Sequence, residues 1–179
     1  MNNQDIEVEI RSFISDEQYN AILPKLENIA KYVSETEEET VYFSSDKDLR
    51  LRRNKKEASI ILKEGKIHDN FRKEYEVKFN VVDFEKMEDL LKSLGYEIKI
   101  KWFRRRLKYE QDDVKIFLDD TRGYGKIIEI EKMVNLGEEK FAYKNLENRL
   151  KDFDIKITSK DEFNSAFEYY KNNWESLIK

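Results

Sequence analysis

Cysteine is missing from this 179-residue sequence, and histidine occurs once, as His68. Without a thiol the chain can form no disulfide, no thiolate nucleophile and no cysteine-based zinc site. A single imidazole also excludes a metal centre built from several histidines. His68 falls in a predicted turn, EGKIHDN, and we expect it to face solvent.

Long apolar segments and chain-breaking residues are scarce as well. No apolar run approaches the roughly 18 residues of a membrane span, and the first residues, MNNQD, lack the basic and apolar regions of a signal peptide. One proline and five glycines leave no low-complexity linker that would mark a domain boundary. We therefore expect a single domain over residues 1–179, in a soluble cytoplasmic protein without a membrane partner.

Charge is abundant but balanced. Charged residues make up 40% of the chain, with 34 Lys and Arg against 38 Asp and Glu, and the net charge is −4. A general nucleic-acid coat would need a basic excess, so we expect no nucleic-acid partner. The balance permits a locally basic site inside an acidic whole. The hydrophobic fraction of 39% is enough for a folded core.

Alternation of apolar and polar residues predicts about eight strands. The segments between them are mostly short and have the composition of hairpin turns, as in SSDK, NKKE, EQDD and TRGYGK, so neighbouring strands should pair antiparallel. The predicted strands are residues 5–13, 38–44, 47–53, 57–64, 71–81, 97–109, 113–120 and 126–134.

Amphipathic stretches fill the remaining sequence and predict helices. Capping boxes open the first and the last of them, formed by Ser15 with Gln18 and by Ser159 with Glu162. Pro24 lies inside the first helix and should kink or split it. The predicted helices are residues 15–33, 83–94, 138–152 and 160–178. The predicted fold class is α+β, an eight-stranded antiparallel β-barrel or sheet with these helices packed on its outside.

Two of the strands each carry a Glu-x-Glu pair on one face. The stretch IEVEIR places Glu7 and Glu9 opposite an isoleucine–valine face, and IIEIEK does the same with Glu129 and Glu131. Charged and apolar faces separate in this way in at least six strands. The other charged positions on these faces are Arg11, Arg50, Arg52, Lys63, Glu74, Glu76, Lys78, Arg104, Arg106, Lys108 and Asp119.

Either of two arrangements would explain the charged faces. For any one strand, a solvated sheet face is the ordinary explanation. Exposed faces, however, usually mix Thr, Ser, Gln and Lys, whereas these hold mostly Glu and Arg. Eight strands is about the number that closes a barrel with a filled interior or one small ligand. A closed barrel would have a polar lumen in which carboxylates face guanidinium and ammonium groups.

Such a lumen suits a particular ligand. Inward charges are costly to desolvate and need partners. A highly charged anion together with a divalent cation would satisfy both sets. Carboxylates suit a hard cation such as Mg²⁺ or Mn²⁺, which usually also takes phosphate oxygens. Arginine forks match phosphate geometry. A triphosphate fits this inventory better than a carboxylate metabolite.

With these elements in order, the sequence resembles the CYTH superfamily, also called triphosphate tunnel metalloenzymes, over nearly the whole chain. EVEIR corresponds to the family's N-terminal E-x-E-x-K, LRLR to its paired-arginine strand, ILK to its strand ending in lysine and FRRRLKY to its basic strand. The most specific match is LDDTRGYGKIIEIE, which resembles the family's L-D-x-x-x-G-x-G-x-x-x-E-x-E segment.

The resemblance implies an eight-stranded tunnel and a role for each matching residue. Glu7, Glu9, Glu129 and Glu131 match the metal-binding carboxylates, and Asp119 matches an acid at the metal end. The implied catalytic set is Glu7, Glu9 and Asp119. The implied triphosphate-binding set is Arg11, Arg50, Arg52, Lys63, Glu76, Arg104 and Arg106. Glu74 and Glu76 both lie on the family's acidic strand, and the sequence leaves open which of them faces inward.

Three segments depart from the family pattern. The hallmark lysine is Arg11, which keeps the charge but cannot serve as a proton-transfer base. The strand TVYFSS lacks the aspartates often found there, and the C-terminal Ser-Tyr signature has only ITSKDEF as its counterpart.

Three functions follow as hypotheses. The first is metal-dependent hydrolysis of a triphosphate (inorganic tripolyphosphate, thiamine triphosphate or a nucleoside triphosphate), with Mg²⁺ or Mn²⁺ as cofactor. The second is class IV adenylyl cyclase activity, which also needs an adenine pocket and an activated ribose 3′-hydroxyl. The third is non-catalytic binding of a polyphosphate, which gains nothing from paired glutamates. A monomer or a homodimer is compatible with all three.

Overall fold

The computed structural model describes residues 6–64 and 73–179. His68 and the first two residues of the strand expected at 71–81 lie outside these ranges. The described residues form one antiparallel sheet with the strand order β1-β8-β7-β6-β2-β3-β4-β5. Its strands are β1 (Ile6–Ile14), β2 (Lys31–Phe43), β3 (Asp48–Arg53), β4 (Ala58–Glu64), β5 (Lys73–Phe79), β6 (Ile98–Gln111), β7 (Val114–Thr121) and β8 (Gly125–Val134).

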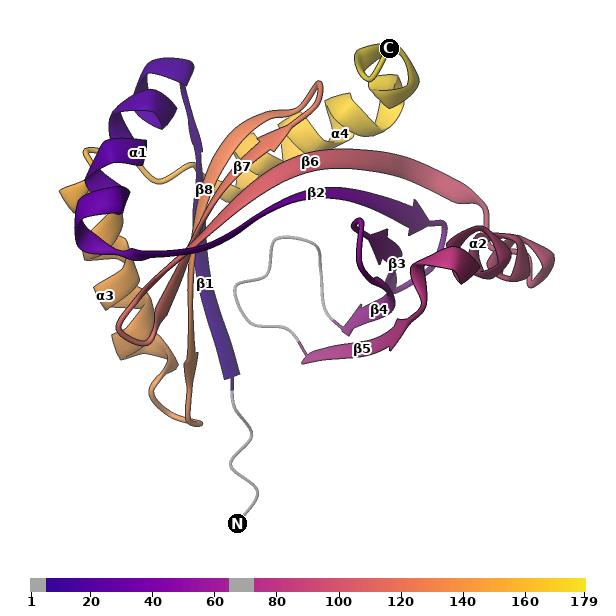
Figure 1. Cartoon of the computed structure of the whole chain (residues 1–179), viewed down its shortest axis with the longest axis horizontal. Coiled ribbons are helices and arrows are strands. Elements are labelled where there is room, and N and C mark those ends of the chain that lie inside the picture. The colour runs from indigo at the N-terminus through magenta and orange to yellow at the C-terminus, as the bar shows by residue number, and fades with distance from the viewer. Residues whose placement is uncertain (1–5, 65–72) are drawn as a thin grey trace.

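The sheet is curled, and its central strands are long. β2 and β6 pair from Lys31 opposite Glu110 to Phe43 opposite Ile98, and they arch over the hollow of the molecule (Figure 1). The predicted eight-stranded antiparallel architecture is confirmed, and its shape is a half-barrel. Among the described residues no ladder joins the two end strands β1 and β5, so the curled sheet has two edges.

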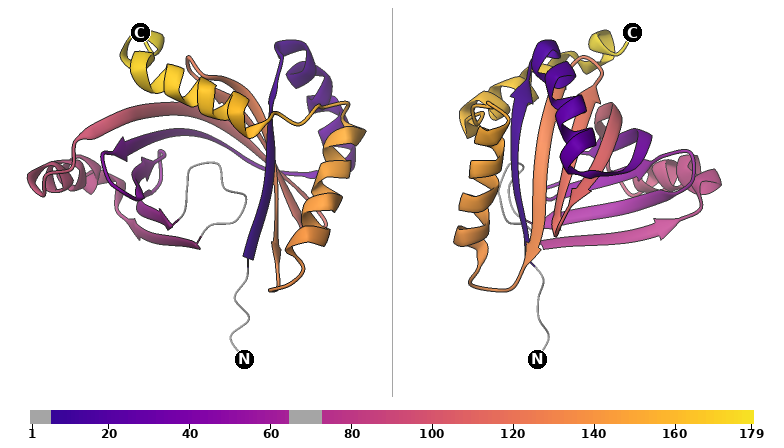
Figure 2. Two further views of the ribbon diagram at one scale, coloured as in Figure 1. Left: turned by 180° about the vertical axis from the view of Figure 1, so that it is seen from behind. Right: turned by 60° about the vertical axis from the view of Figure 1, so that its left-hand side comes forward.

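Helices pack around the sheet, as predicted (Figure 2). They are α1 (Asp16–Ile29), α2 (Phe84–Ser93), α3 (Glu139–Asp152) and α4 (Lys160–Leu177), with a short 3₁₀ helix η1 (Val81–Asp83) before α2. Three of them, α1, α2 and α3, lie on its convex side, whereas α4 packs against inward-facing residues of β6 and lends Phe163 and Phe167 to the wall of the hollow. The capping boxes at Ser15 and Ser159 are both formed. No helix of the described chain has the length and apolar character needed to cross a membrane.

The apolar strand faces and helix stripes make three clusters. The largest lies between α1, α3 and strands β1, β7 and β8, and contains Ile22, Leu26, Leu146 and Ile128. The second joins α2 to β3 and β4, and the third joins α4 to β6. Burial of the apolar side chains on the convex face leaves the charged faces of the strands on the concave side.

The first helix differs from its prediction at the C-terminal end. It ends at Ile29 instead of residue 33, and the strand expected at 38–44 already begins at Lys31. Residues 31–36 are drawn into the sheet because β6 is long enough to pair with them. Pro24 does not split α1; it lies on the exposed face, where water can satisfy the carbonyl that lacks an amide partner.

The chain between α3 and α4 lies along the edge of β1. The backbone N–H of Phe13 donates to Thr158 Oγ1 at 2.9 Å, and Ser12 Oγ donates to the carbonyl of Lys156 at 2.6 Å. These bonds satisfy part of an edge that would otherwise attract another strand.

Candidate functional site

A charged cavity of about 570 Å³ occupies the concave side of the sheet. Every one of the eight strands contributes to its wall, because alternate residues of each strand point inward. All the site residues expected from the sequence line it: Glu7, Glu9, Arg11, Arg50, Arg52, Lys63, Glu76, Arg104, Arg106, Asp119, Glu129 and Glu131. Glu74 lines it as well, so both acids of β5 face inward.

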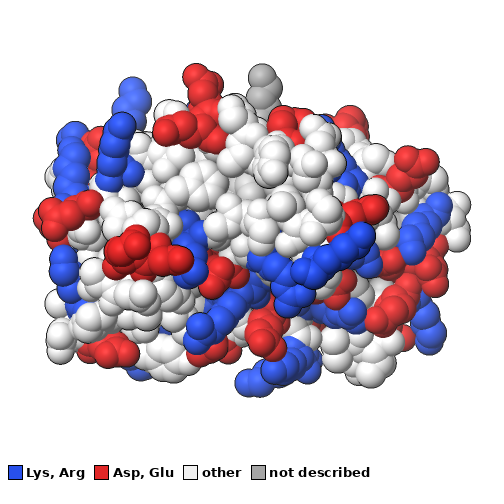
Figure 3. Space-filling model, turned by 90° about the horizontal axis from the view of Figure 1, so that it is seen from above, with Lys and Arg blue, Asp and Glu red and all other residues white. Residues whose placement is uncertain are grey.

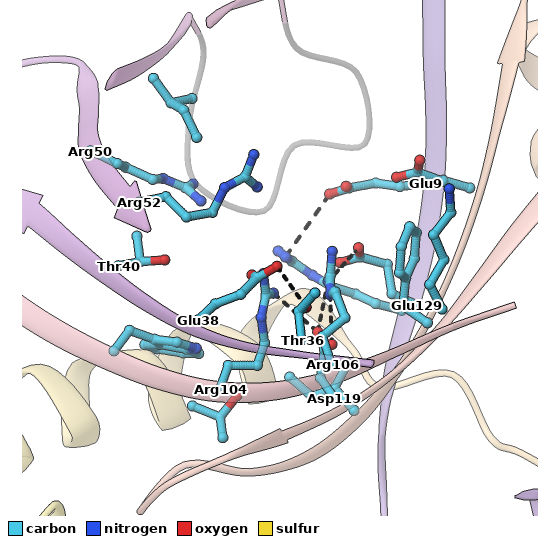
Figure 4. A pocket seen from close by; sticks show the side chains of 18 of the residues that line it. Glu9, Thr36, Glu38, Thr40, Arg50, Arg52, Arg104, Arg106, Asp119 and Glu129 are labelled. Atoms are coloured by element: carbon cyan, nitrogen blue, oxygen red, sulfur yellow. Dashed lines mark hydrogen bonds and ion pairs between the residues drawn. The ribbon is translucent and has the colours of Figure 1, made fainter. Parts of the chain in front are cut away.

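Charged side chains are gathered more closely in the cavity than on the outer surface. On the face seen from above, acidic and basic side chains are interspersed (Figure 3). Inside, Arg50 and Arg52 of β3 lie on one side of the hollow, and Glu9 and Glu129 lie on the other (Figure 4). The two walls therefore present opposite charges to anything bound between them.

A buried network holds the floor of the cavity together. Asp119, which is 3% exposed, accepts from Arg106 Nε and Nη2, both at 2.7 Å, and from Arg104 Nη1 at 3.1 Å. Arg106 also donates to Glu129 at 2.9 Å, and Arg104 donates to Glu38 at 2.5 Å. Figure 4 shows these side chains converging from β2, β6, β7 and β8. The network fixes both guanidinium groups before any ligand arrives.

The network also controls ionisation. Burial alone would raise the pKa of Glu38, but the charges of Arg104 and Arg106 lower it to about 2. The same opposition of burial and arginine charge lowers the pKa of Glu129 to about 2. Both carboxylates are therefore ionised at neutral pH and serve as permanent negative charges.

Carboxylates predominate at the β1–β8 wall. Glu9 lies directly opposite Glu131 in the ladder, and Arg11 lies opposite Glu129. Burial, followed by repulsion from Glu131, raises the pKa of Glu7 to about 7, although Lys63 opposes this shift. A carboxyl group whose pKa is raised by burial and by neighbouring carboxylates marks a place that is short of positive charge.

The carboxylate wall has the donor chemistry that a hard divalent cation requires. Within the described residues, however, no three acidic side chains converge closely enough to form a ready ligand shell. Three of the four acids are turned toward a base: Glu131 accepts from Lys115 at 2.8 Å, Glu9 lies 4.0 Å from Arg11, and Glu129 accepts from Arg106 at 2.9 Å. Glu7, Glu9, Glu129 and Glu131 therefore fit a metal by chemistry and by position on two adjacent strands, and side-chain rotation would complete the site.

The bases of β3 and β4 are paired in the same way. Arg52 donates to Glu76 at 2.7 Å, and Lys63 lies 2.5 Å from Glu74. Arg50 bonds Asp48, a neighbour on its own strand. These contacts hold the basic side chains in place along the cavity wall.

Aromatic rings support three of the cavity arginines. The guanidinium carbon lies 5.0 Å from the ring centre of Phe163 for Arg11, 4.6 Å from Tyr42 for Arg50, and 4.2 Å from Phe117 for Arg106. A planar guanidinium stacks on such a ring better than an ammonium group does. The arginine at position 11, where the family has lysine, thus has a partner in α4.

Sequence reasoning missed several lining residues. Ser34 and Thr36 were missed because residues 34–37 fell between the predicted helix and the predicted strand, and Glu38 lay in that predicted strand but was not among the candidate site residues. Their alternation along SETEEET, residues 34–40, was the available signal. Two buried polar atoms of the lining, Arg104 Nε and Thr121 Oγ1, have no hydrogen-bond partner in the described structure, which leaves hydrogen-bonding capacity for a ligand.

Comparison with known proteins agrees with this geometry. The CYTH domain family model matches residues 5–162. A candidate adenylate cyclase of Methanocaldococcus jannaschii, MJ0240, is 28% identical over 139 residues, which cover 73% of this chain and 78% of that protein. A conserved hypothetical protein of Pyrococcus furiosus has a TM-score of 0.70 and 28% identity, over 84% of this chain and 91% of that chain.

A plant structure shares the fold at lower identity. HpAC1 of Hippeastrum, a candidate adenylyl cyclase described as having a dominant triphosphatase activity, has a TM-score of 0.63 and 17% identity, over 92% of this chain and 96% of that chain. The family match covers most of the sequence, and the matching segments form the strands of one charged half-barrel. By these criteria the chain belongs to the CYTH domain family.

Proposed function

We propose that this chain is a metal-dependent triphosphatase that hydrolyses a triphosphate bound along the charged cavity. CYTH proteins act on triphosphates and generally depend on a divalent metal, and the family includes both triphosphatases and adenylyl cyclases. The observation that carries the proposal is one continuous cavity in which arginines and lysines of β3, β4 and β6 are brought together with the carboxylate wall of β1 and β8. Inorganic tripolyphosphate, thiamine triphosphate and nucleoside triphosphates are the candidate substrates.

Binding would proceed by exchange of partners. Arg52 and Lys63 now contact Glu76 and Glu74, and phosphate oxygens can take the place of these carboxylates. Arg104 and Arg106 already present fixed forks from the floor of the cavity. Contacts with neighbouring carboxylates already hold these basic side chains in place, so substrate binding costs little further side-chain entropy.

The carboxylate wall would hold the cation. Glu7, Glu9, Glu129 and Glu131 are the proposed ligands of Mg²⁺ or Mn²⁺. When bound, the ion would neutralise charge on phosphate oxygens and polarise the bond that breaks. The glutamates also keep the surrounding wall negative, so that phosphate without a cation is repelled from it.

The reaction itself requires an oriented water. The water oxygen bonds to the terminal phosphorus while the bond from that phosphorus to the bridging oxygen breaks, and diphosphate, or the corresponding diphosphate ester, leaves. Glu7, Glu9 and Asp119 are the acids that we propose orient the water and take its proton. Arg104 and Arg106 offset the charge that develops on the phosphoryl oxygens.

Adenylyl cyclase activity is the second candidate, and one observation favours it. Trp102, Tyr124 and Phe163 line the cavity together with Arg11, so part of the wall is aromatic. A wall of this kind is compatible with a base attached to the triphosphate. In that reaction a ribose 3′-hydroxyl replaces water, attacks the α-phosphorus and releases pyrophosphate.

A product assay separates the two. The protein is incubated with tripolyphosphate, thiamine triphosphate or ATP, each with Mg²⁺, with Mn²⁺ and with a chelator, and the products are resolved by phosphorus NMR and chromatography. Orthophosphate release that depends on the metal supports the triphosphatase. Formation of cyclic AMP with stoichiometric pyrophosphate would instead show adenylyl cyclase activity. Substrate that stays intact under all conditions would show that the protein only binds the triphosphate.

A further inference from the structure

The two edges of the half-barrel are treated differently. β1 is covered by the chain before α4, through the bonds to Thr158 and Lys156. β5 stands at the other end of the strand order and, among the described residues, pairs with β4 alone. A strand edge that presents unpaired amides and carbonyls is a template for another strand.

The outer face of β5 is apolar and accessible. Val77 is 63% exposed and Tyr75 is 45% exposed. They continue a row that begins on β4, because Val77 lies opposite Ile60 and Tyr75 lies opposite Leu62. α2 packs on the second cluster without covering these two side chains.

The inner face of β5 carries alternating charge. Glu76 accepts from Arg52 at 2.7 Å, and Lys78 donates to Glu57 at 3.1 Å. Glu76 and Lys78 flank Val77 on the strand. A two-fold axis through Val77 would therefore set each glutamate against a lysine.

We propose that β5 pairs antiparallel with β5 of a second copy of this chain, about a two-fold axis at Val77. Val77 then lies opposite the partner's Val77, Glu76 opposite the partner's Lys78, and Tyr75 opposite the partner's Phe79. Each pair is of a kind that stabilises a sheet. The interface is isologous, so it closes at two copies and joins the two half-barrels into one continuous sheet.

The pairing of opposite charges favours this register over the two registers with the axis at an adjacent residue. An axis at Glu76 sets that residue against its own copy, and an axis at Tyr75 sets Glu74 against Glu76. Both place like charges directly opposite, which destabilises a ladder. With the axis at Val77, a charge row runs from Arg52 through Glu76 to the partner's Lys78 and the partner's Glu57.

Sedimentation and light scattering of the full chain over a wide concentration range test the dimer. Wild type is expected to be a dimer that dissociates on dilution. Val77→Lys sets two ammonium groups against each other on the axis and is expected to raise the dissociation constant at least about tenfold. The matched control is Leu136→Lys, an apolar residue 81% exposed beyond β8, which should leave the dimer unchanged.

The register is tested by cross-linking, for which the absence of native cysteine is an advantage. Directly opposed residues of an antiparallel pair lie about 4.5–5.5 Å apart between Cα atoms, within the range of a disulfide. Val77→Cys is expected to form a covalent dimer on mild oxidation, and Tyr75→Cys to remain largely monomeric on a non-reducing gel.

Each possible outcome either supports or contradicts the proposed interface. A concentration-dependent dimer that Val77→Lys weakens and Val77→Cys traps supports the interface. A monomer at every concentration, a dimer that Val77→Lys does not affect, or cross-linking through Tyr75→Cys in preference to Val77→Cys would overturn it. Thermal unfolding of each variant shows that its fold is retained, and the cross-linking result stands even if the lysine variant fails to fold.

Discussion

Asp119→Asn should be among the most destabilising polar substitutions in this protein. Asp119 is 3% exposed and accepts three hydrogen bonds from Arg104 and Arg106. The amide keeps the size of the side chain but removes its charge and turns one acceptor into a donor facing a guanidinium. Two buried arginines are then left with fewer compensating carboxylates.

The magnitude follows from these contacts. Removing one partner of a buried ion pair costs about 3–5 kcal/mol, and the amide oxygen can still accept a bond, so the lower end applies. For a domain of this size each kcal/mol lowers the melting temperature by about 2–4 °C, which gives a decrease of about 6–12 °C. Calorimetry of the metal-free protein at neutral pH, with urea unfolding as a second measurement, gives the value.

A surface ion pair supplies the control. Glu168 lies 2.7 Å from Lys171 on α4, and its side chain is mostly exposed. Glu168→Gln should cost no more than about 0.5 kcal/mol. If Asp119→Asn melts no lower than Glu168→Gln, the buried network contributes nothing to stability and our account of the cavity floor is wrong.

Three further results are expected. Glu129→Gln should abolish metal-dependent turnover because it removes a proposed ligand charge, and turnover retained in a metal titration would sink the metal assignment. Arg52→Ala should weaken triphosphate binding by about tenfold to a hundredfold, the loss of a charged hydrogen bond, with a smaller effect on kcat in steady-state kinetics. The pKa of Glu38 is about 2 in the fold and 4.5 in its absence, so its contribution to stability is complete above pH 4.5 and disappears as the pH falls toward 2. The difference in urea stability between wild type and Glu38→Gln should therefore shrink from pH 7 to pH 3, and a constant difference would contradict the pairing with Arg104.

Strand periodicity was the reliable part of the sequence. Alternation with a period of two assigns each side chain to a face, and it placed Glu9, Arg104 and Glu129 on the charged strand faces, which line the cavity in the structure. The capping boxes were equally dependable because they are local. Both signals depend on residues a few positions apart, and tertiary contacts rarely override them.

The failures came where a distant partner decides the outcome. Ile29 and Val33 continue the apolar spacing of α1, yet Val33 belongs to β2, because pairing with β6 claims this stretch. The curl of the sheet and its open side depend on twist accumulated over many strands, which no single segment encodes. The aromatic support of Arg11 comes from Phe163 of α4, far away in the sequence, so it was not visible either.

The pairing of β1 with β8 also bears on how the protein is made. Glu9 and Glu131 face each other, but one belongs to the first strand of the chain and the other to the last. During synthesis β1 is complete long before β8 exists. Until then the backbone groups of β1 on that side have no strand to pair with, and Glu9 has no opposing Glu131. The proposed metal site therefore cannot nucleate folding. It is completed only when β8 pairs with β1, late in folding and through contacts of high sequence separation.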